Sequence, residues 1–338
     1  MAGMNTDLLT LVRQALLFER LHTIPELSRT LSTSFPTIKK HLDILIEHGE
    51  VDEQDSDVSS GGRPAKRYRY RADHTHGLAL YLELDAIGYR IFDAVGTLLT
   101  NGTVSVPRQQ PHVPALVRLI HRLLAQDPRI TFLSIGVAAS VEDGKVFFAP
   151  DYPSLQQVDL KQTLESEFRL PVVIENDMNA AVVGFHEADQ NRQQSLIYLY
   201  LGKNGPGSGI LINGQLVRGS SHFAGEISVV PQYDKMTFGQ AIAKRRATLD
   251  AQTIDAISRL TATFAATLNP RLLIFNGEEL TEHDLEQIQF KTTEYIPEAH
   301  IPLLIRSNWE TDYLNGLTRI GLQLLTEQPL SANRRSSS

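Results

Sequence analysis

Apolar residues near the N-terminus recur every three or four positions, which is the spacing of a helix that buries one face. Leu27 and Leu31 mark such a face in a first predicted helix. In a second predicted helix, one stripe collects four apolar side chains: Ile38, Leu42, Leu45 and Ile46. The pattern therefore predicts two consecutive helices separated by a short turn, and the second helix leaves a polar face open to solvent.

Start and stop signals support both helices. Thr23 and Glu26 have the spacing of a capping box, in which each side chain accepts a hydrogen bond from the other residue's backbone amide. The second helix is predicted to begin at Ser34-Phe35-Pro36, with a hydroxyl cap and a proline in its first turn, and to end at Gly49. Its outer face carries the residues that we predict to contact DNA: Thr37, Lys39, Lys40 and His41.

A basic run follows the two helices. Residues 61–71 hold five basic and no acidic residues, although residues 1–75 as a whole hold 10 Lys and Arg against 11 Asp and Glu. Such clustering is the footprint that DNA binding requires. We therefore predict an α+β winged helix-turn-helix domain over residues 1–73. Its second helix would enter the major groove of double-stranded operator DNA, and its wing would carry Arg63, Lys66 and Arg67. A small helical adaptor that binds protein is the alternative.

The pattern changes after residue 77 to two similar halves, 77–190 and 191–328, in which three strands precede alternating helices and strands. Strands are predicted at Leu78–Leu84, Gly88–Asp93, Leu98–Val106, Ile130–Ala138, Val146–Phe148, Pro171–Glu175, Ser195–Leu201, Gly209–Ile212, Gln215–Val217, Glu226–Val230, Arg271–Asn276 and Pro302–Arg306. Helices are predicted near residues 113–126, 160–169, 238–246, 251–268, 282–295 and 313–328. A duplicated α/β lobe of this kind would place a ligand cleft between the two copies.

Composition narrows the class of protein. The 338 residues are 42% hydrophobic and carry a formal charge of −7, which fits a chain of two or three folded domains and argues against non-specific coating of nucleic acid. No apolar run approaches the roughly 20 residues of a membrane span. Residues 1–18 form an amphipathic stretch rather than a signal peptide, so we expect a cytoplasmic protein without a membrane partner. The absence of cysteine excludes thiolate metal sites, and residues 329–338 are expected to be a disordered tail.

Residues 175–181, Glu-Asn-Asp-Met-Asn-Ala-Ala, end a predicted strand and open a helix. They resemble the Glu-Asn-Asp-x-Asn-Ala-Ala signature of the ROK proteins, a family of sugar kinases and sugar-responsive repressors with an actin/hexokinase-like fold. Three further segments are similar to that family: 201–210, 218–227 and 269–277. The resemblance covers about residues 77–325. It implies a two-lobed α/β actin/hexokinase-like (ROK) domain behind the winged helix-turn-helix, as in the repressor branch.

The matching residues suit sugar hydroxyls, which both donate and accept hydrogen bonds. Asn176 offers both roles, and Asp177 and Glu226 offer charged acceptors. By the resemblance, Asp177 occupies the position of the catalytic base in the kinases. Asp151 falls where the family often has a sugar-contacting asparagine, and His222 lies near the Ala-Gly-Glu motif. The alternative for Asn176 and Asp177 is simple capping of the helix that begins there.

Two departures from the family pattern decide the predicted activity. Kinases of the family have Asp-x-Gly-Gly-Thr in the first hairpin, whereas residues 83–88 read Glu-Leu-Asp-Ala-Ile-Gly, so that Asp85 would repel a triphosphate. Pro206 removes a backbone donor from the second phosphate loop. Because phosphoryl transfer depends on positioning and charge stabilisation, we predict that the domain is not an enzyme, that Asp177 is silent, and that no cofactor is used.

The family's zinc motif is a further departure from the family pattern. Val229 occupies the position of its histidine, and residues 231–248 contain neither cysteine nor histidine. A structural zinc needs about four nitrogen or sulfur ligands, so we predict that no metal binds there.

The sequence as a whole therefore predicts a DNA-binding transcription regulator, a repressor, whose silent ROK-like domain senses a sugar or sugar phosphate. The second lobe is expected to dimerise, which gives a homodimer or a dimer of dimers. One alternative is an active ATP-dependent sugar kinase with an accessory DNA-binding module. The other is a constitutive DNA-binding protein whose large domain only dimerises.

Overall fold

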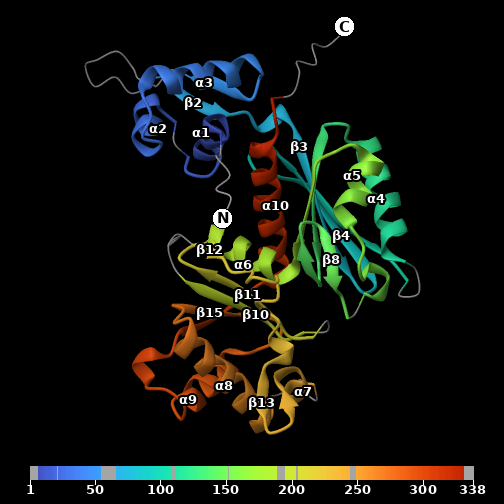
Figure 1. Ribbon diagram of the computed structural model, residues 1–338, viewed down its shortest axis with the longest axis vertical. Coiled ribbons are helices and arrows are strands. Elements are labelled where there is room, and N and C mark those ends of the chain that lie inside the picture. The colour runs from blue at the N-terminus through green and yellow to red at the C-terminus, as the bar shows by residue number, and fades with distance from the viewer. Residues whose placement is uncertain are drawn as a thin grey trace.

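The computed structural model describes residues 7–20, 22–54, 66–107, 111–150, 152–188, 195–202, 205–243 and 249–330 (Figure 1). The chain begins with a small unit, the N-terminal module (residues 7–74), whose elements are α1 (Leu8–Leu17), α2 (Ile24–Thr30), α3 (Phe35–Glu47), β1 (Val51–Gln54), β2 (Arg67–Tyr70) and the 3₁₀ turn η1 (Ala72–His74). Strands β1 and β2 pair antiparallel. Arg63 and the loop of residues 59–62 lie outside the described residues, as do residues 331–338 of the predicted tail.

The two helices predicted from apolar spacing are present. The Thr23–Glu26 capping box forms at the start of α2, and the Ser34 hydroxyl accepts from the Thr37 amide at the start of α3. The apolar stripe of α3 enters a core that α1 also helps to build, through residues Leu9, Val12, Leu16, Leu27, Ile38, Leu42 and Leu45. Since α1 supplies part of this core, the N-terminal amphipathic stretch is a structural element of the module.

The first lobe contains a five-stranded sheet in the order β5-β4-β3-β6-β9. Its strands are β3 (His76–Glu83), β4 (Ala86–Asp93), β5 (Leu98–Ser105), β6 (Ile130–Val137) and β9 (Val172–Asn176), and a small hairpin adds β7 (Ser140–Glu142) and β8 (Lys145–Phe148). Helices α4 (His112–Gln126) and α5 (Leu160–Phe168) cover one face, and η2 (Pro153–Leu155) is a short 3₁₀ turn. Alternate residues of β3 serve opposite faces: Leu80 packs on the α4–α5 side and Tyr81 on the other.

The second lobe repeats this plan with the strand order β12-β11-β10-β15-β16. Its strands are β10 (Leu196–Tyr200), β11 (Gly207–Ile212), β12 (Gln215–Leu216), β15 (Leu272–Asn276) and β16 (Leu303–Ser307). Its outer face carries α8 (Ala251–Thr267) and α9 (Glu282–Thr292), beside α7 (Phe238–Ile242), the turns η3 (Ile227–Val229) and η4 (Glu298–His300), and a hairpin of β13 (Pro231–Tyr233) and β14 (Met236–Thr237).

One predicted strand is wrong. Residues 226–230 form a turn and the 3₁₀ segment η3 instead of a strand. Strand β11 already pairs with β10 on one side and with β12 on the other, so the segment cannot pair with β11. The segment therefore satisfies its backbone locally, with the Val230 amide donating to the Ile227 carbonyl at 3.1 Å.

Helices α6 (Asp177–Ala188) and α10 (Trp309–Glu327) lie between the two sheets and share a core with both (Figure 1). Their backbones approach closely, because a Cβ atom at Gly184 would lie 1.8 Å from the Asp312 carbonyl oxygen, and one at Gly316 would lie 1.8 Å from that of Ala180. The two lobes are therefore joined through a tightly packed helix pair.

The C-terminal end of α10 meets the N-terminal module at a buried arginine. Arg13 donates from Nε to Glu50 at 2.7 Å and from a terminal nitrogen to the Gln328 carbonyl at 2.7 Å, and Tyr70 also donates to Glu50 at 3.0 Å. Both Arg13 and Glu50 are 3% exposed. The guanidinium therefore satisfies carbonyl groups that the end of a helix leaves without partners, and it ties the module to α10. Among the helices of the described residues, none is both long and apolar enough to cross a membrane.

Gly316→Ala should destabilise the protein by about 1–3 kcal/mol or more, because the added methyl group would overlap the backbone of α6. Gly321→Ala on the same helix is the control. It gains the same helix propensity, and its Cβ would meet side-chain atoms at 3.1–3.2 Å rather than backbone, so it should cost less stability. Urea unfolding measures the free energy of each variant. Equal stability of Gly316→Ala and wild type would contradict the close contact between the helices.

Candidate ligand pocket and nucleic-acid interface

A cavity of about 270 Å³ opens between the lobes at the N-terminal end of α6. Four of the predicted ligand-binding residues line it: Asn176, Asp177, His222 and Glu226. Asp151 lies outside the described residues. The volume is just below the roughly 300–1,000 Å³ of pockets for drug-sized ligands, so the cavity has the scale of a single sugar ring.

Asn176 is held by the helix that it precedes. Its side-chain oxygen accepts from the amides of Met178 and Asn179 at 2.9 and 3.0 Å, and its Nδ2 donates to the Ala139 carbonyl at 3.1 Å. Asn176 therefore caps the N-terminus of α6, which is the alternative that the sequence left open for this residue. At most one N–H of Asn176 is left for a ligand.

Asp177 is buried, with 7% of its surface exposed. Burial raises the pKa of its carboxyl group to about 7, because the ionised form loses hydration; the hydrogen bond from the Met178 amide opposes this rise, and the charges of Glu83 and Glu226 add to it. The sequence suggested a charged acceptor here. At neutral pH, however, a large fraction of Asp177 carries a proton, so the carboxyl group can donate a hydrogen bond as well as accept one.

Glu226 reaches the pocket from the second lobe. Ser140 of the first lobe donates to its carboxylate at 2.5 Å. The preceding Gly225 has φ +97°, and a Cβ there would lie 2.1 Å from the Ser208 carbonyl oxygen, so only glycine fits. This backbone turn directs Glu226 across the cleft.

Two further side chains at the pocket were quoted in motifs but not predicted as site residues. Arg218 of the second lobe pairs with buried Glu175 of the first lobe at 2.5 Å. Glu175 also accepts from the Asn176 amide at 3.0 Å and from Asn179 Nδ2 at 2.9 Å. A salt bridge between residues 43 positions apart has no local sequence signal, which explains why the spacing of motifs did not reveal it.

Residues 218–226, the bridging segment, touch the first lobe at two more points. His222 Nδ1 donates to the Val141 carbonyl at 3.1 Å, and the rings of Phe223 and Phe148 meet edge to face at 6.1 Å. The bridging segment thus closes the pocket by linking the second lobe to β7 and β8. A change in the spacing between the lobes would break these contacts.

A second cavity of about 860 Å³ lies between the lobes and shares Tyr200, Gly205 and Pro206 with the first. Four of its lining residues are glutamates: Glu83, Glu278, Glu279 and Glu310. No lysine or arginine is among the lining residues that the structure describes. The Glu83 turn belongs to the hairpin in which, by the resemblance, kinases hold the phosphoryl group. A phosphate chain would therefore meet carboxylates where it needs donors and cations.

The predicted DNA-contact residues occupy the outer surface of the N-terminal module. Lys40 and Arg67 are exposed, and Thr37 and His41 are half-buried. Glu53, on β1, pairs with Lys66 and lies 3.9 Å from Lys39. Lys39 also pairs with Asp43. The module's basic surface is therefore partly neutralised by its own carboxylates, which the count over residues 61–71 overlooked because Glu53 lies on the neighbouring strand.

Comparison with known proteins supports the resemblance drawn from the motifs. Residues 84–237 match the model of the ROK family, so the chain contains a ROK family domain. It is 27% identical to the xylose repressor of Bacillus subtilis (strain 168) over 211 residues, which are 60% of this chain and 54% of that repressor. It is 31% identical to a glucokinase of Streptomyces coelicolor over 149 residues, which are 42% of this chain and 46% of that enzyme. The chain thus spans about half the length of the curated relatives it matches.

The fold is shared with solved structures. A crystal structure of a ROK family transcriptional regulator, a homologue of the E. coli MLC protein, superposes with a TM-score of 0.74 at 15% identity. The superposition covers 95% of this chain and 99% of that one. The likeness establishes the two-lobed actin/hexokinase-like α/β fold.

Asp177→Asn should flatten the pH dependence of stability. Since the folded-state pKa of about 7 lies above the ordinary value of 3.8 for an aspartate, Asp177 stabilises the fold most at low pH, and this contribution is lost as pH rises through 7. Between pH 5 and 8, the free energy of unfolding of wild type should fall relative to the variant by about 2–3 kcal/mol, at about 1.4 kcal/mol per pKa unit.

Urea unfolding at the two pH values measures this difference. Glu83→Gln keeps Asp177 but removes a neighbouring charge, so it should move the loss of stability to lower pH. A constant gap between wild type and Asp177→Asn at all pH values would contradict the burial of an ionisable Asp177.

Proposed function

We propose that this chain, which contains a ROK family domain, is a DNA-binding transcription regulator. We infer that it acts as a repressor and senses a sugar in the pocket between its lobes. The proposal rests on one observation: packed helices connect the pocket to the N-terminal module. The pocket lies at the first turn of α6, α6 packs on α10, and α10 meets the N-terminal module at Arg13.

The N-terminal module supplies the DNA-binding part of the proposal. Helices α2 and α3 are separated by a short turn, and β1 and β2 form a ribbon beside them, which is the element order of a winged helix-turn-helix. We assign α3 to the major groove, with Thr37 and Lys40 facing the bases or phosphates. Exposed Arg67 and Arg69 of β2 belong to the wing and suit the phosphate backbone.

The pocket favours a neutral sugar over a sugar phosphate. Asp177 and Glu226 offer carboxyl oxygens to hydroxyl groups, whereas they would repel a phosphate. Arg218 also lines the pocket, but its guanidinium is engaged by Glu175. Relatives named xylose repressor are consistent with a neutral aldose as the ligand of this chain.

A sugar kinase is the second candidate, because a carboxyl group with a pKa of about 7 is well matched to general base catalysis. Glucokinases among the relatives make this candidate concrete. The glutamates of the second cavity argue against it, since a kinase must bind the phosphates of ATP close to the same carboxyl group. We therefore favour a sensor that does not transfer phosphate.

A neutral aldose should raise the stability of the wild-type protein, by about 2.7 kcal/mol at about 100 times its Kd, whereas the matching sugar phosphate should not. Thermal shift against a panel of aldoses and their phosphates measures the effect. Glu226→Gln should abolish most of the shift, because a hydrogen bond to a charged group contributes roughly 1.5–3 kcal/mol. Glu298→Gln, an exposed residue remote from the pocket, is the charge-matched control.

Two results would redirect the proposal. ATP hydrolysis that depends on the same aldose, seen in a coupled assay, would favour the kinase. A panel without any shift would favour a domain that only dimerises.

Glu53→Gln should strengthen DNA binding, because it releases Lys66 and Lys39 from a carboxylate. The slope of log affinity against log salt should steepen by up to about 0.9 for each lysine that gains a phosphate contact. Lys40→Ala should have the opposite effect on slope and affinity. Glu298→Gln again controls for the change in net charge. An unchanged slope in both Glu53→Gln and Lys40→Ala would show that the surface around these residues does not contact DNA.

A further inference from the structure

The resemblance implies a structural zinc in the segment that follows Glu226, and the residues present do not fit one. Val229, at the histidine position, is 47% exposed, and the chain has no cysteine. Within the described residues, no group of three or more His, Cys, Asp or Glu side chains could hold a metal ion. The segment therefore needs another means of attachment to the second lobe.

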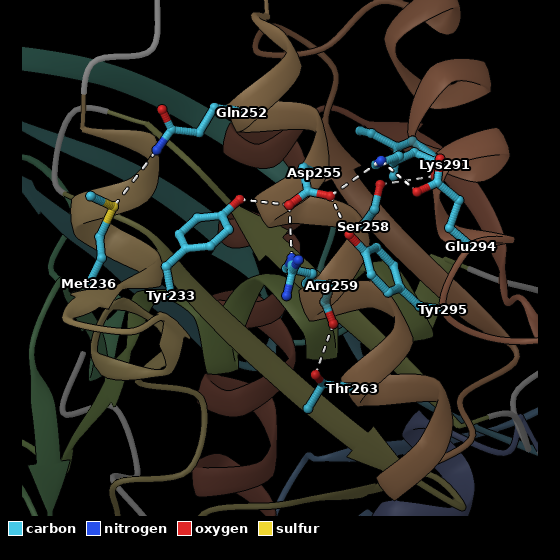
Figure 2. Close-up of polar contacts among 11 residues, drawn as sticks. Tyr233, Met236, Gln252, Asp255, Ser258, Arg259, Thr263, Lys291, Glu294 and Tyr295 are labelled. Carbon is cyan, nitrogen blue, oxygen red and sulfur yellow. Dashed lines mark hydrogen bonds and ion pairs between the residues drawn. The ribbon is translucent and has the colours of Figure 1, made fainter.

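The β13–β14 hairpin in this segment is attached by a hydrogen bond to a carboxylate. Tyr233 at the end of β13 donates from its hydroxyl group to Asp255 of α8 at 2.8 Å (Figure 2). A weaker contact joins Met236 of β14 to Gln252 of α8 at 3.8 Å. The hairpin is thus held against α8 by side-chain contacts.

Asp255 is the centre of this attachment. Besides Tyr233, it accepts from Arg259 Nε at 2.8 Å and from the Tyr295 hydroxyl group, and Lys291 Nζ lies 3.6 Å away (Figure 2). Burial alone would raise its pKa, but the hydrogen bonds from Tyr295, Arg259 and Tyr233 outweigh burial and lower the pKa to about 2. The carboxylate is therefore ionised at neutral pH and surrounded by donors.

Arg259 adds a second layer to the arrangement. Its guanidinium carbon lies 5.1 Å from the centre of the Tyr233 ring and 5.0 Å from that of Tyr295, within the range of cation–π contact. The two tyrosines are thus fixed at both the hydroxyl group and the ring. Three segments far apart in sequence, β13, α8 and the turn after α9, are joined at one point.

We propose that the cluster of Tyr233, Asp255, Arg259 and Tyr295 takes the place of the structural zinc that the resemblance implies. The cluster attaches the segment after Glu226 to the second lobe. In place of a cation with four ligands, the cluster has a central anion with converging donors. Its role is to position Glu226 for the ligand, and this part rests on the proposed function. Tyr233 is accordingly a positioning residue and touches no ligand itself.

The connection from Tyr233 to Glu226 is short and internally bonded. Only residues 227–232 separate them, and these form η3 and the start of β13. The Phe238 amide donates to the Val230 carbonyl at 2.7 Å, and a Cβ at Gly239 would lie 3.0 Å from the Ser228 carbonyl oxygen, so α7 packs closely on η3. A displaced hairpin therefore displaces the turn that carries Glu226.

The test compares Tyr233→Phe with Tyr295→Phe in the full-length protein. Each variant removes one hydroxyl group that donates to Asp255, but only Tyr233 lies on the hairpin. In the ligand-free protein, Tyr233→Phe should speed hydrogen exchange of the amides of residues 226–237 by about tenfold, the loss expected for one hydrogen bond to a charged group. Tyr295→Phe should leave exchange in that segment near the wild-type rate while speeding it at the end of α9.

The second measurement is affinity for the aldose with the largest thermal shift. Tyr233→Phe should weaken it several-fold and Tyr295→Phe should not, even where both lose similar thermal stability. Equal effects of the two variants on residues 226–237 would overturn the proposal, and so would stoichiometric zinc in the purified protein together with faster exchange there after chelation. A wild type that binds no aldose would refute the proposed function alone, since the exchange comparison needs no ligand.

Discussion

The close approach of α6 and α10 is the constraint on which the rest of the structure depends. Gly184 and Gly316 allow each helix to reach the backbone of the other, and no side chain could be inserted without moving them apart. Because α6 starts at the pocket and α10 ends beside the N-terminal module, the pair connects the two places where function is expected. Motion of one lobe would reach the module through this rigid contact rather than through a flexible linker.

The two cavities between the lobes differ in the charge of the side chains that line them. The smaller one combines Asp177, whose pKa is raised, with Glu226, and both groups suit hydroxyls. The larger one is lined by glutamates that would oppose phosphates. The same carboxylate Glu83 contributes to both effects, since it lines the larger cavity and raises the pKa of Asp177. In the proposed function, one set of side chains therefore both disfavours a phosphate chain and favours a sugar.

Local signals made much of the fold predictable. The capping box at Thr23, the stripe of α3 and the duplicated strand pattern depend on near neighbours, and they predicted elements that the structure contains. Contacts between distant residues were not predictable in this way. The pairs Arg13–Glu50 and Ser140–Glu226 have no characteristic spacing in the sequence. The strand predicted at residues 226–230 was wrong because that segment bonds within itself, in η3, and joins no sheet.

The central claim is that binding of a ligand in the pocket and binding of DNA to the N-terminal module are coupled. The most direct test measures the Kd for operator DNA with and without saturating aldose, and the Kd for the aldose with and without DNA. If the account is right, each ligand changes the affinity of the other by the same factor, of about 5–150, because coupling free energy is reciprocal. Identical affinities in the presence and absence of the other ligand would contradict it.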